Sequence, residues 1–236
     1  MNDQQGRNVK HLPYEIDPRN RFHFYENYWK RVGLELLTRH FPASSDKTIL
    51  DYGCGRGEAL QIFGDAGFQT VGADVDPECV KRAAAFGKSL ILNPDDPIAQ
   101  FGKKSFDVVT CFHVLEHVDF PKKTLGELGQ IARSYVVVAV PNLRNLHGVF
   151  RRTINLNETN EGHLQSWDHG HFLNLAERHC GLKLVEWGYD ATILSILSNF
   201  SQRLFGTQPT IFLETGIFKR MFPWHGISVL GLFRPA

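Results

Sequence analysis

A glycine-rich loop behind an acidic residue is the part of the sequence best suited to bind a ligand. Gly53, Gly55 and Gly57 alternate with other residues, and Asp51 stands two positions before the first of them. Glycines let the chain turn tightly and let a ligand approach the backbone, and the start of the helix expected next offers free N–H groups. The loop therefore predicts a small-molecule site, although a plain strand-to-helix turn would use the same glycines.

The loop differs from the fingerprint that binds a dinucleotide. That fingerprint is G-x-G-x-x-G, and it places a pyrophosphate on the helix N-terminus. Here the third glycine, Gly57, comes one residue early, and the carboxylate of Asp51 suits an ammonium group better than a pyrophosphate. A nicotinamide-dependent oxidoreductase is therefore the weaker alternative.

More acidic residues follow the next two expected strands. Asp74 ends a strand about twenty residues after the loop, where an acid can hydrogen-bond both hydroxyls of a ribose. Asp95 and Asp96 follow the third strand, where a surface turn explains them as well as a contact with an adenine does. Asp76 precedes a proline and is typical of a helix N-cap instead.

A group of histidines follows the fourth expected strand. His113, Glu116 and His117 match the H-x-x-E-H pattern of a zinc protease group. The pattern follows a buried strand and has no third ligand placed with it, so we predict no metal. An imidazole at position 113 could instead accept a proton from a substrate hydroxyl, or line a pocket without titrating.

Strands and helices alternate between these residues. Alternation with helix-length segments predicts a mostly parallel sheet with helices on both faces. The expected strands are 47–52, 70–74, 90–92, 106–112, 135–140, 182–187 and 228–233. The expected helices are 22–41, 57–66, 76–86, 121–133 and one that Asp168 caps and Gly181 ends.

Four elements in order resemble one protein family. They are the glycine loop after Asp51, the acid Asp74, the acids after the third strand, and Phe106-Asp107-Val108-Val109 with Leu115-Glu116-His117-Val118. Together they resemble the class I S-adenosylmethionine-dependent methyltransferases, in particular the ubiquinone/menaquinone-biosynthesis-like superfamily. The resemblance implies an α/β fold: a Rossmann-like three-layer α/β/α sandwich with a mostly parallel seven-stranded sheet and an antiparallel last strand.

The resemblance also implies a cofactor, S-adenosyl-L-methionine, whose product is S-adenosyl-L-homocysteine. Asp51 and the loop would hold the methionine end, Asp74 the ribose and Asp95 the adenine edge. The predicted cofactor-binding residues are Asp51, Gly53, Cys54, Gly55, Gly57, Asp74, Val75, Asp95, Asp96 and Phe112. His113 is the predicted catalytic base, and the predicted substrate-side residues are Tyr25, His117, His163 and Trp167.

The domain organisation follows from the same patterns. We expect an N-terminal arm and lid helix over 1–46 and a Rossmann-like domain over 47–236 with an insertion at about 191–226. An apolar stripe in the insertion, which includes Ile196, Phe200 and Leu204, predicts a helix packed on the sheet. A lid over a hydrophobic substrate, a dimer face and a membrane contact remain alternatives, and the oligomeric state stays open.

Composition narrows the choice of partner and location. The 236 residues hold 26 Lys and Arg against 25 Asp and Glu, so no strongly basic footprint for nucleic acid is present. The four cysteines form no C-x-x-C pair, and the polar start lacks the apolar core of a signal peptide. No apolar run approaches transmembrane length, and we expect a cytoplasmic protein.

These observations predict transfer of a methyl group to an oxygen or carbon of a small-molecule acceptor, with a hydrophobic acceptor as one option. No N/D-P-P-Y/F motif follows the fourth strand, which weighs against methylation of nucleobase amino groups. The alternative is a catalytically silent protein that binds S-adenosylmethionine as a sensor or partner subunit.

Overall fold

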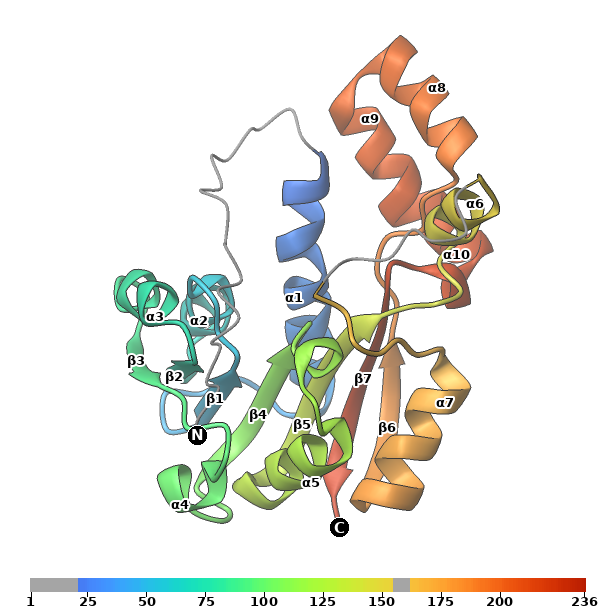
Figure 1. The fold of residues 1–236 in the computed structure, drawn as a ribbon. Helices are drawn as coiled ribbons and strands as arrows, with labels where there is room; N and C mark the ends of the chain where they lie inside the picture. The colour runs from blue at the N-terminus through green and yellow to red at the C-terminus, as the bar shows by residue number, and fades with distance from the viewer. Residues whose placement is uncertain (1–20, 155–161) are drawn as a thin grey trace, which may run out of the picture.

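A computed structural model describes residues 21–154 and 162–236 of the chain (Figure 1). The strands are β1 Thr48–Tyr52, β2 Gln69–Asp74, β3 Lys88–Ile91, β4 Phe106–Phe112, β5 Ala132–Pro141, β6 Leu182–Gly188 and β7 Ser228–Pro235. The helices of the sandwich are α1 Arg21–His40, α2 Glu58–Asp65, α3 Pro77–Ala83, α4 Pro97–Phe101, η1 Leu115–His117, α5 Pro121–Ile131, α7 His169–Leu173 and the π-helix η2 Asn174–His179. The remaining helices are α6 Leu146–Ile154, α8 Ser195–Phe205, α9 Thr207–Phe212, the π-helix η3 Leu213–Phe218, α10 Lys219–Met221 and η4 Pro223–His225.

The strands form one seven-stranded sheet in the order β3-β2-β1-β4-β5-β7-β6. β1 pairs in parallel with β2 and with β4, and β4 pairs in parallel with β5. β7 is antiparallel to both of its neighbours, β5 and β6. The predicted mostly parallel sheet with an antiparallel last strand is therefore confirmed, and the strand order reverses between β1 and β4.

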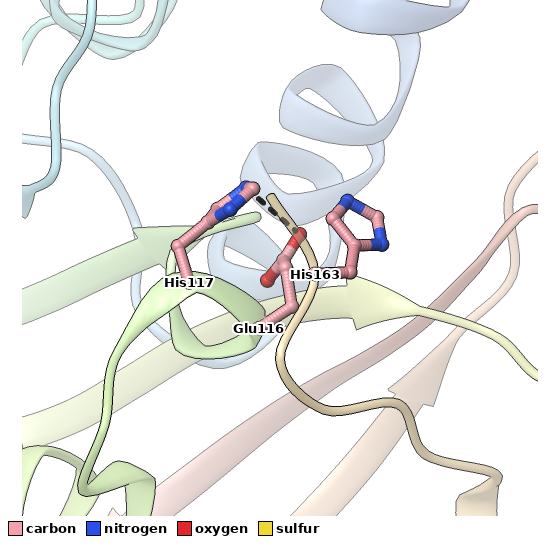
Figure 2. A group of neighbouring side chains, drawn as sticks. All are labelled: Glu116, His117 and His163. Carbon is pink, nitrogen blue, oxygen red and sulfur yellow. Dashed lines mark ion pairs between the residues drawn. The ribbon is translucent and has the colours of Figure 1, made fainter. Parts of the chain in front are cut away.

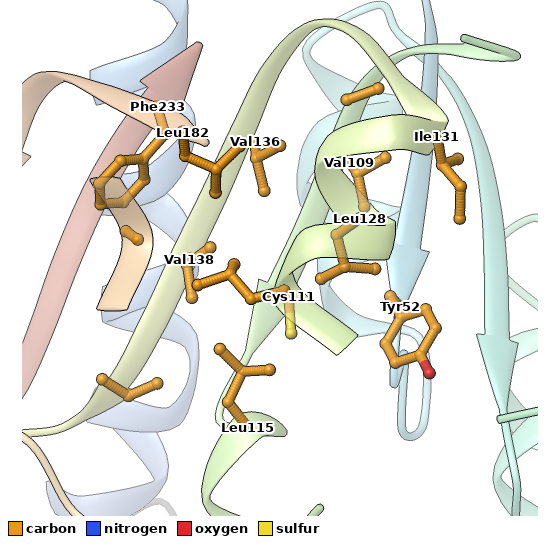
Figure 3. Packing of buried hydrophobic residues seen from close by; sticks show 14 of the residues in the cluster. Tyr52, Val109, Cys111, Leu115, Leu128, Ile131, Val136, Val138, Leu182 and Phe233 are labelled. Carbon is orange, nitrogen blue, oxygen red and sulfur yellow. The ribbon is translucent and has the colours of Figure 1, made fainter. Parts of the chain in front are cut away.

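Helices cover both faces of the sheet and complete the three layers. On one face Val32, Leu36 and Leu37 of α1 pack with α2 against β4, β5 and β7, and α3 lies beside α2. On the other face α4, α5 and α7 with its π-helical continuation η2 cover the second core (Figure 3). There Leu128 of α5 lies over Val109, Val136 and their neighbours.

Capping residues set where several helices begin. The side chain of Asp76 accepts a hydrogen bond from Glu78 N, and Pro77 occupies the first turn of α3, as the sequence predicts. Asp168 caps α7 in the same way by accepting from His171 N. α2 begins after the predicted position, at Glu58, because Gly57 has a left-handed conformation with φ 92°.

The sequence pattern missed α4, α6 and the helical run from α9 through η3 to α10. α4 has only five residues, too few for an apolar period to emerge, and Asp96 caps it by accepting from Ala99 N. The expected arm before residue 21 lies outside the described residues, and the expected division at residue 46 stays a prediction.

The helices α6, α8, α9 and α10 lie beyond the edge of the sheet at which the parallel strands end (Figure 1). α8 and α9 form a hairpin that projects from this edge, here called the α8–α9 hairpin. The prediction that its apolar stripe packs on the sheet is wrong, because Ile196, Phe200 and Leu204 are exposed. Among the described residues no helix has both the length and the apolar character needed to cross a bilayer.

A close approach between α1 and the sheet gives the first prediction. A Cβ at Gly33 would lie 2.9 Å from the Phe112 ring and 3.3 Å from Val137 Cγ1, so Gly33→Val should destabilise the fold by about 1–3 kcal/mol through overpacking. Urea unfolding followed by circular dichroism measures the change.

Gly126 of α5 is the matched control, because a Cβ there meets nothing within 4 Å. Gly126→Ala should stabilise the fold by roughly 0.5–1 kcal/mol, since alanine favours a helix. Equal midpoints for Gly33→Val and the wild type would contradict the proposed packing of α1.

Candidate functional site

The glycine loop turns directly after β1 and is fixed by backbone bonds to β2. Gly53 N and Cys54 N both donate to Ala73 O, at 2.8 and 3.0 Å. Gly53, Gly55 and Gly57 all have positive φ, which side chains other than glycine rarely adopt. A Cβ at Gly53 would clash with Val114, so the loop also touches the segment that follows β4.

Gly55 gives the loop its open face. A Cβ at Gly55 would meet nothing within 4 Å, in contrast to Gly53 and Gly57, whose neighbours fill that space. A ligand can therefore approach the backbone at this residue, as a nucleoside cofactor requires. The loop fits the cofactor that the sequence predicts.

Asp51 lies under the loop in the dry interior. Its side chain is buried and accepts a hydrogen bond from Thr110 Oγ1 at 2.7 Å, across the β1–β4 pair. Burial raises the pKa of Asp51 to about 6, although the bond from Thr110 acts in the opposite direction. A carboxylate held this way favours a cationic partner, because a positive charge would offset its desolvation.

Asp74 at the end of β2 organises the neighbouring backbone. One of its oxygens accepts from Gly55 N at 2.8 Å and the other accepts from Asp76 N at 3.0 Å. Carboxylate oxygens have further lone pairs, so Asp74 can hold the loop and still accept from ribose hydroxyls. Val75 beside it is exposed, as a residue that covers a ligand face would be.

The two acids after β3 have different surroundings. Asp95 is exposed, and its backbone carbonyl accepts from Lys123 Nζ at 2.8 Å. Asp96 is also exposed, but its carboxylate caps α4. The contact of Asp95 with an adenine edge stays a prediction, whereas the carboxylate of Asp96 caps a helix, as the surface-turn alternative expects.

His113 follows β4 in a strained conformation. Its φ of 55° is left-handed, a region that residues other than glycine rarely enter, although asparagine, aspartate and histidine enter it more often than the rest. Its Nδ1 lies 3.2 Å from Glu116 Oε1, its Nε2 lies 2.9 Å from Ser228 Oγ, and the Trp29 ring covers it with centroids 4.4 Å apart. Strain of this kind persists where several contacts fix the residue, which is typical of functional sites.

Glu116 is the charged partner that orients His113. Its side chain is buried, and burial, the largest effect, raises its pKa, but the bond and charge of His113, a backbone hydrogen bond and the nearby His117 together lower the pKa below its usual value. A carboxylate on one ring nitrogen fixes the tautomer and stabilises the imidazolium, as in a catalytic triad. His113 therefore has the surroundings of a base.

Glu116, His117 and His163 form a group at the same place (Figure 2). One potential ligand atom from each lies within 4.8 Å of the others, and His117 Nδ1 lies 2.8 Å from Gly162 O. Burial lowers the pKa of His163, which favours a neutral imidazole. These ligand types can hold a divalent metal. The prediction that no metal takes part stays a prediction.

The H-x-x-E-H spacing does not produce the helical pair of histidines that it would on a long helix. η1 is a single 3₁₀ turn, Leu115–His117, and His113 stands before it in the left-handed region. His113 and His117 therefore approach Glu116 from different sides, with His117 Nε2 at 3.9 Å.

Three aromatic residues predicted for the site have their rings in the interior instead of at an opening, and the Cys54 side chain is buried too. The Phe112 ring packs with Phe63 under α1, with centroids 6.2 Å apart. The Trp167 ring is buried against Phe172, at 5.9 Å. Tyr25 is buried where α1 meets η3, and its hydroxyl donates to the Glu214 carboxylate. Their rings contribute to packing. No neighbouring residue in the sequence indicates that these side chains turn into the core.

Ser228 and Asp190 are site residues that the sequence analysis missed. Ser228 stands at the start of β7, 115 positions from the histidine it contacts. Asp190 accepts from Ser228 N at 3.0 Å, and burial raises the pKa of this acid to about 6. Only the pairing of β7 with β5 brings these residues to His113, so no local pattern could reveal them.

The fold and the site together define a class I methyltransferase architecture: a β3-β2-β1-β4-β5-β7-β6 sheet with a glycine loop and acids at the ends of its first two strands. The chain belongs to the methyltransferase domain family, whose model matches residues 21–186. By this family and by its fold the chain is a class I methyltransferase.

Similar proteins agree with this assignment. The chain is 32% identical over 97 residues to a ubiquinone biosynthesis O-methyltransferase of Idiomarina loihiensis, which covers 39% of this chain and 40% of that protein. The curated relatives it matches are covered over less than half of their own length.

Two solved structures share the fold. One is a Haloferax volcanii methyltransferase in complex with the Trm112 activator, with TM-score 0.64, 20% identity and coverage of 91% and 92% of the two chains. The other is the magnesium protoporphyrin IX methyltransferase of Synechocystis with bound S-adenosylhomocysteine, with TM-score 0.63, 14% identity and coverage of 94% and 91%.

The raised pKa of Asp51 predicts how cofactor affinity depends on pH. The affinity for S-adenosylhomocysteine, which carries the same ammonium group, should rise up to about tenfold per pH unit as pH increases toward about 6 and level off above it, because only the carboxylate attracts the ammonium. Calorimetric titration between pH 5 and 8 measures this affinity at each pH, and the expected change is an order-of-magnitude figure.

Asp51→Asn provides the comparison, because an amide can still accept from Thr110 but cannot titrate. Asp190 has a similar pKa and is retained in the variant, so a pH slope that persists in Asp51→Asn would assign the effect elsewhere.

Proposed function

We propose that this protein transfers a methyl group from S-adenosylmethionine to an oxygen or carbon of a small-molecule acceptor, with His113 as the base. The observation that carries the proposal is the contact of His113, the first residue after β4, with Glu116 on one ring nitrogen and Ser228 on the other. The residue after His113, Val114, touches the glycine loop. A base and a cofactor loop at one strand end are what a methyl transfer needs.

The chain's own residues bind and orient the cofactor. Gly55 leaves the backbone open, Asp51 offers a buried carboxylate to the ammonium group, and Asp74 offers lone pairs to the ribose. Lys30 of α1 pairs with Glu58 at the start of α2, at 3.2 Å, and so ties the covering helix to the loop. When bound, S-adenosylmethionine supplies a methyl group activated by its sulfonium.

The transfer needs a proton acceptor when the nucleophile is a hydroxyl. The nucleophile's lone pair forms the new bond to the methyl carbon, and the carbon–sulfur bond breaks with its electron pair left on sulfur. His113 Nε2 takes the hydroxyl proton, either directly or through Ser228, and Glu116 stabilises the imidazolium. Most of the rate comes from in-line alignment, and the base supplies a smaller part.

Two observations support oxygen or carbon as the acceptor atom. No N/D-P-P-Y/F motif follows β4, where nucleobase and glutamine methyltransferases carry it. The relative from Idiomarina loihiensis is named as an O-methyltransferase of ubiquinone biosynthesis. A small and partly apolar acceptor fits both.

A catalytically silent role is the second candidate. The Haloferax volcanii structure of the same fold is a complex with a methyltransferase activator. A partner subunit or sensor would bind the cofactor yet transfer no methyl group to any acceptor, and fold alone does not separate the two roles.

Loss of Asp74 should remove cofactor binding. Asp74→Ala takes away the bonds to Gly55 N and Asp76 N as well as the ribose partner, so we expect at least about a hundredfold weaker binding of S-adenosylhomocysteine. Calorimetry measures it, with Asp65→Ala on the exposed end of α2 as the control. Binding of nicotinamide dinucleotides by the wild type, and not of S-adenosylhomocysteine, would defeat the proposal.

Loss of the base should lower turnover and leave binding intact. His113→Asn keeps a residue that tolerates the left-handed conformation, and it should reduce kcat by about 10² to 10⁴ with unchanged affinity for S-adenosylhomocysteine. Release of S-adenosylhomocysteine in a screen of phenols, catechols and carbon acids measures turnover, with His179→Asn as the control. Cofactor binding without turnover on any acceptor would favour the silent role.

A further inference from the structure

The α8–α9 hairpin has its apolar and polar faces reversed relative to an ordinary surface helix. In α8 the exposed fractions of Ile196, Phe200 and Leu204 are 70%, 61% and 59%, whereas Ser198 and Ser201 are buried at 0% and 3%. A helix of a globular protein normally turns its apolar stripe to the core and its polar stripe to water. The outward stripe is therefore available to a partner.

Polar contacts hold the hairpin together from the inside. Thr210 Oγ1 of α9 donates to Ser201 Oγ at 2.9 Å, and Gln202 Nε2 donates to Thr207 Oγ1 at 2.9 Å. These bonds pair Ser201 and Thr210, whereas Ser198 Oγ is buried without a hydrogen-bond partner among the described residues, and the large apolar side chains point away from the protein. The reversal is thus a property of the packed hairpin and not of a loose helix.

Neighbouring helices beyond the same edge of the sheet add exposed apolar side chains to the stripe. Its further exposed members come from α6, α8, α9, η3, α10 and η4: Val149, Phe150, Leu197, Phe205, Phe212, Ile217, Met221 and Trp224. We call these residues, with Ile196, Phe200 and Leu204, the outer apolar surface. Exposed apolar patches of this extent are rare on proteins that work alone in water and mark an interaction site.

Cationic residues outnumber acids in the segments that carry the outer apolar surface. Within 142–154 and 191–226 the cationic residues are Arg144, Arg151, Arg152, Arg203, Lys219 and Arg220. Arg144 pairs with Asp168 at 3.2 Å, and Lys219 donates to the Tyr28 hydroxyl, so the arginines at 151, 152, 203 and 220 make up most of the rim. The acid in these segments, Glu214, is buried and holds Tyr25 and Arg21. The surface thus combines large apolar side chains with a cationic rim, which is the composition of helices that lie in the interface of an anionic membrane.

We propose that the outer apolar surface binds the protein peripherally to a membrane that contains anionic lipid. The cationic rim complements lipid phosphates, whereas a second copy of the chain would bring two cationic rims together and repel. No helix of the described residues could cross the bilayer, so the hairpin lies on it with its apolar side chains among the acyl chains.

The position of the hairpin connects this surface with the candidate site. The hairpin projects from the edge of the sheet at which β4 and β5 end, and the cofactor loop lies at that same edge (Figure 1). Docking on the hairpin would turn this edge, and with it the opening of the site, toward the lipid. A hydrophobic acceptor dissolved in the membrane could then reach His113 without crossing water. Membrane binding itself does not depend on the proposed methyl transfer.

Cosedimentation with vesicles tests the proposal on the full chain. Vesicles that contain phosphatidylglycerol should bind the wild type at least about tenfold more strongly than vesicles of phosphatidylcholine alone, because of the cationic rim. Phe200→Ser should weaken binding about tenfold, since one large side chain no longer leaves water. Phe120→Ser, which alters a phenylalanine 71% exposed at the start of α5, should leave it unchanged.

A charge variant separates the electrostatic part. Arg203→Glu with Arg220→Glu should abolish the preference for phosphatidylglycerol, whereas Lys81→Glu with Lys183→Glu, an equal change on exposed residues elsewhere, should retain it. Thermal melting by circular dichroism confirms that each variant is folded. Absence of wild-type binding to anionic vesicles would overturn the proposal, as would a dimer in sedimentation velocity that Phe200→Ser dissociates, because a second copy would then cover the surface.

Discussion

The parallel direction of six strands is the constraint on which the rest of the molecule depends. Parallel neighbours need crossover connections, so helices cover both faces, and the central strands β1, β4 and β5 are buried on both sides. The same direction brings the ends of β1, β2 and β4 to one edge, with the reversal of strand order between β1 and β4. Ligands of such sheets bind outside that reversal. Asp51, Asp74 and His113 meet there for this reason alone.

Local patterns were enough to predict most of the sheet and the cofactor half of the site. Glycine spacing, strand-end acids and a proline after Asp76 each act within a few residues, so the sequence displays them directly. The prediction that the sheet is mostly parallel with an antiparallel last strand is confirmed. Some strands and helices begin or end a few residues away from the predicted positions, as α2 does because Gly57 stands outside the helix.

The sequence did not predict which way individual side chains point in the folded protein. An apolar period reveals a stripe on α8 but not which side of the helix the fold buries, and here it buries the serines. Phe112 and Trp167 follow strands that end at the site, yet their rings turn into the core. Ser228 and Asp190 reach His113 only through strand pairing over a long stretch of chain. Tertiary packing, not local sequence, fixes all of these.

Buried carboxylates gather on the same side of the molecule. Asp51, Glu116, Asp190 and Glu214 are each removed from water, which costs stability unless a partner compensates. Each has a partner of a different kind: Thr110 for Asp51, His113 for Glu116, Ser228 for Asp190, and Tyr25 with Arg21 for Glu214. Proteins keep such groups where chemistry or a precise geometry needs them. The free energy gained by burying the two hydrophobic clusters offsets the cost of removing these carboxylates from water.

The place of β7 has a consequence for biosynthesis. This strand lies between β5 and β6 although the ribosome makes it after both. Until β7 emerges, β5 offers an unpaired edge and β6 has no strand neighbour at all, while the hydroxyl of Ser228 is still missing from His113. Unpaired edges invite association with other chains. The nascent protein therefore passes through a stage in which the cofactor half is assembled but the sheet is open, and chaperone protection matters most during synthesis of the segment from β6 to β7.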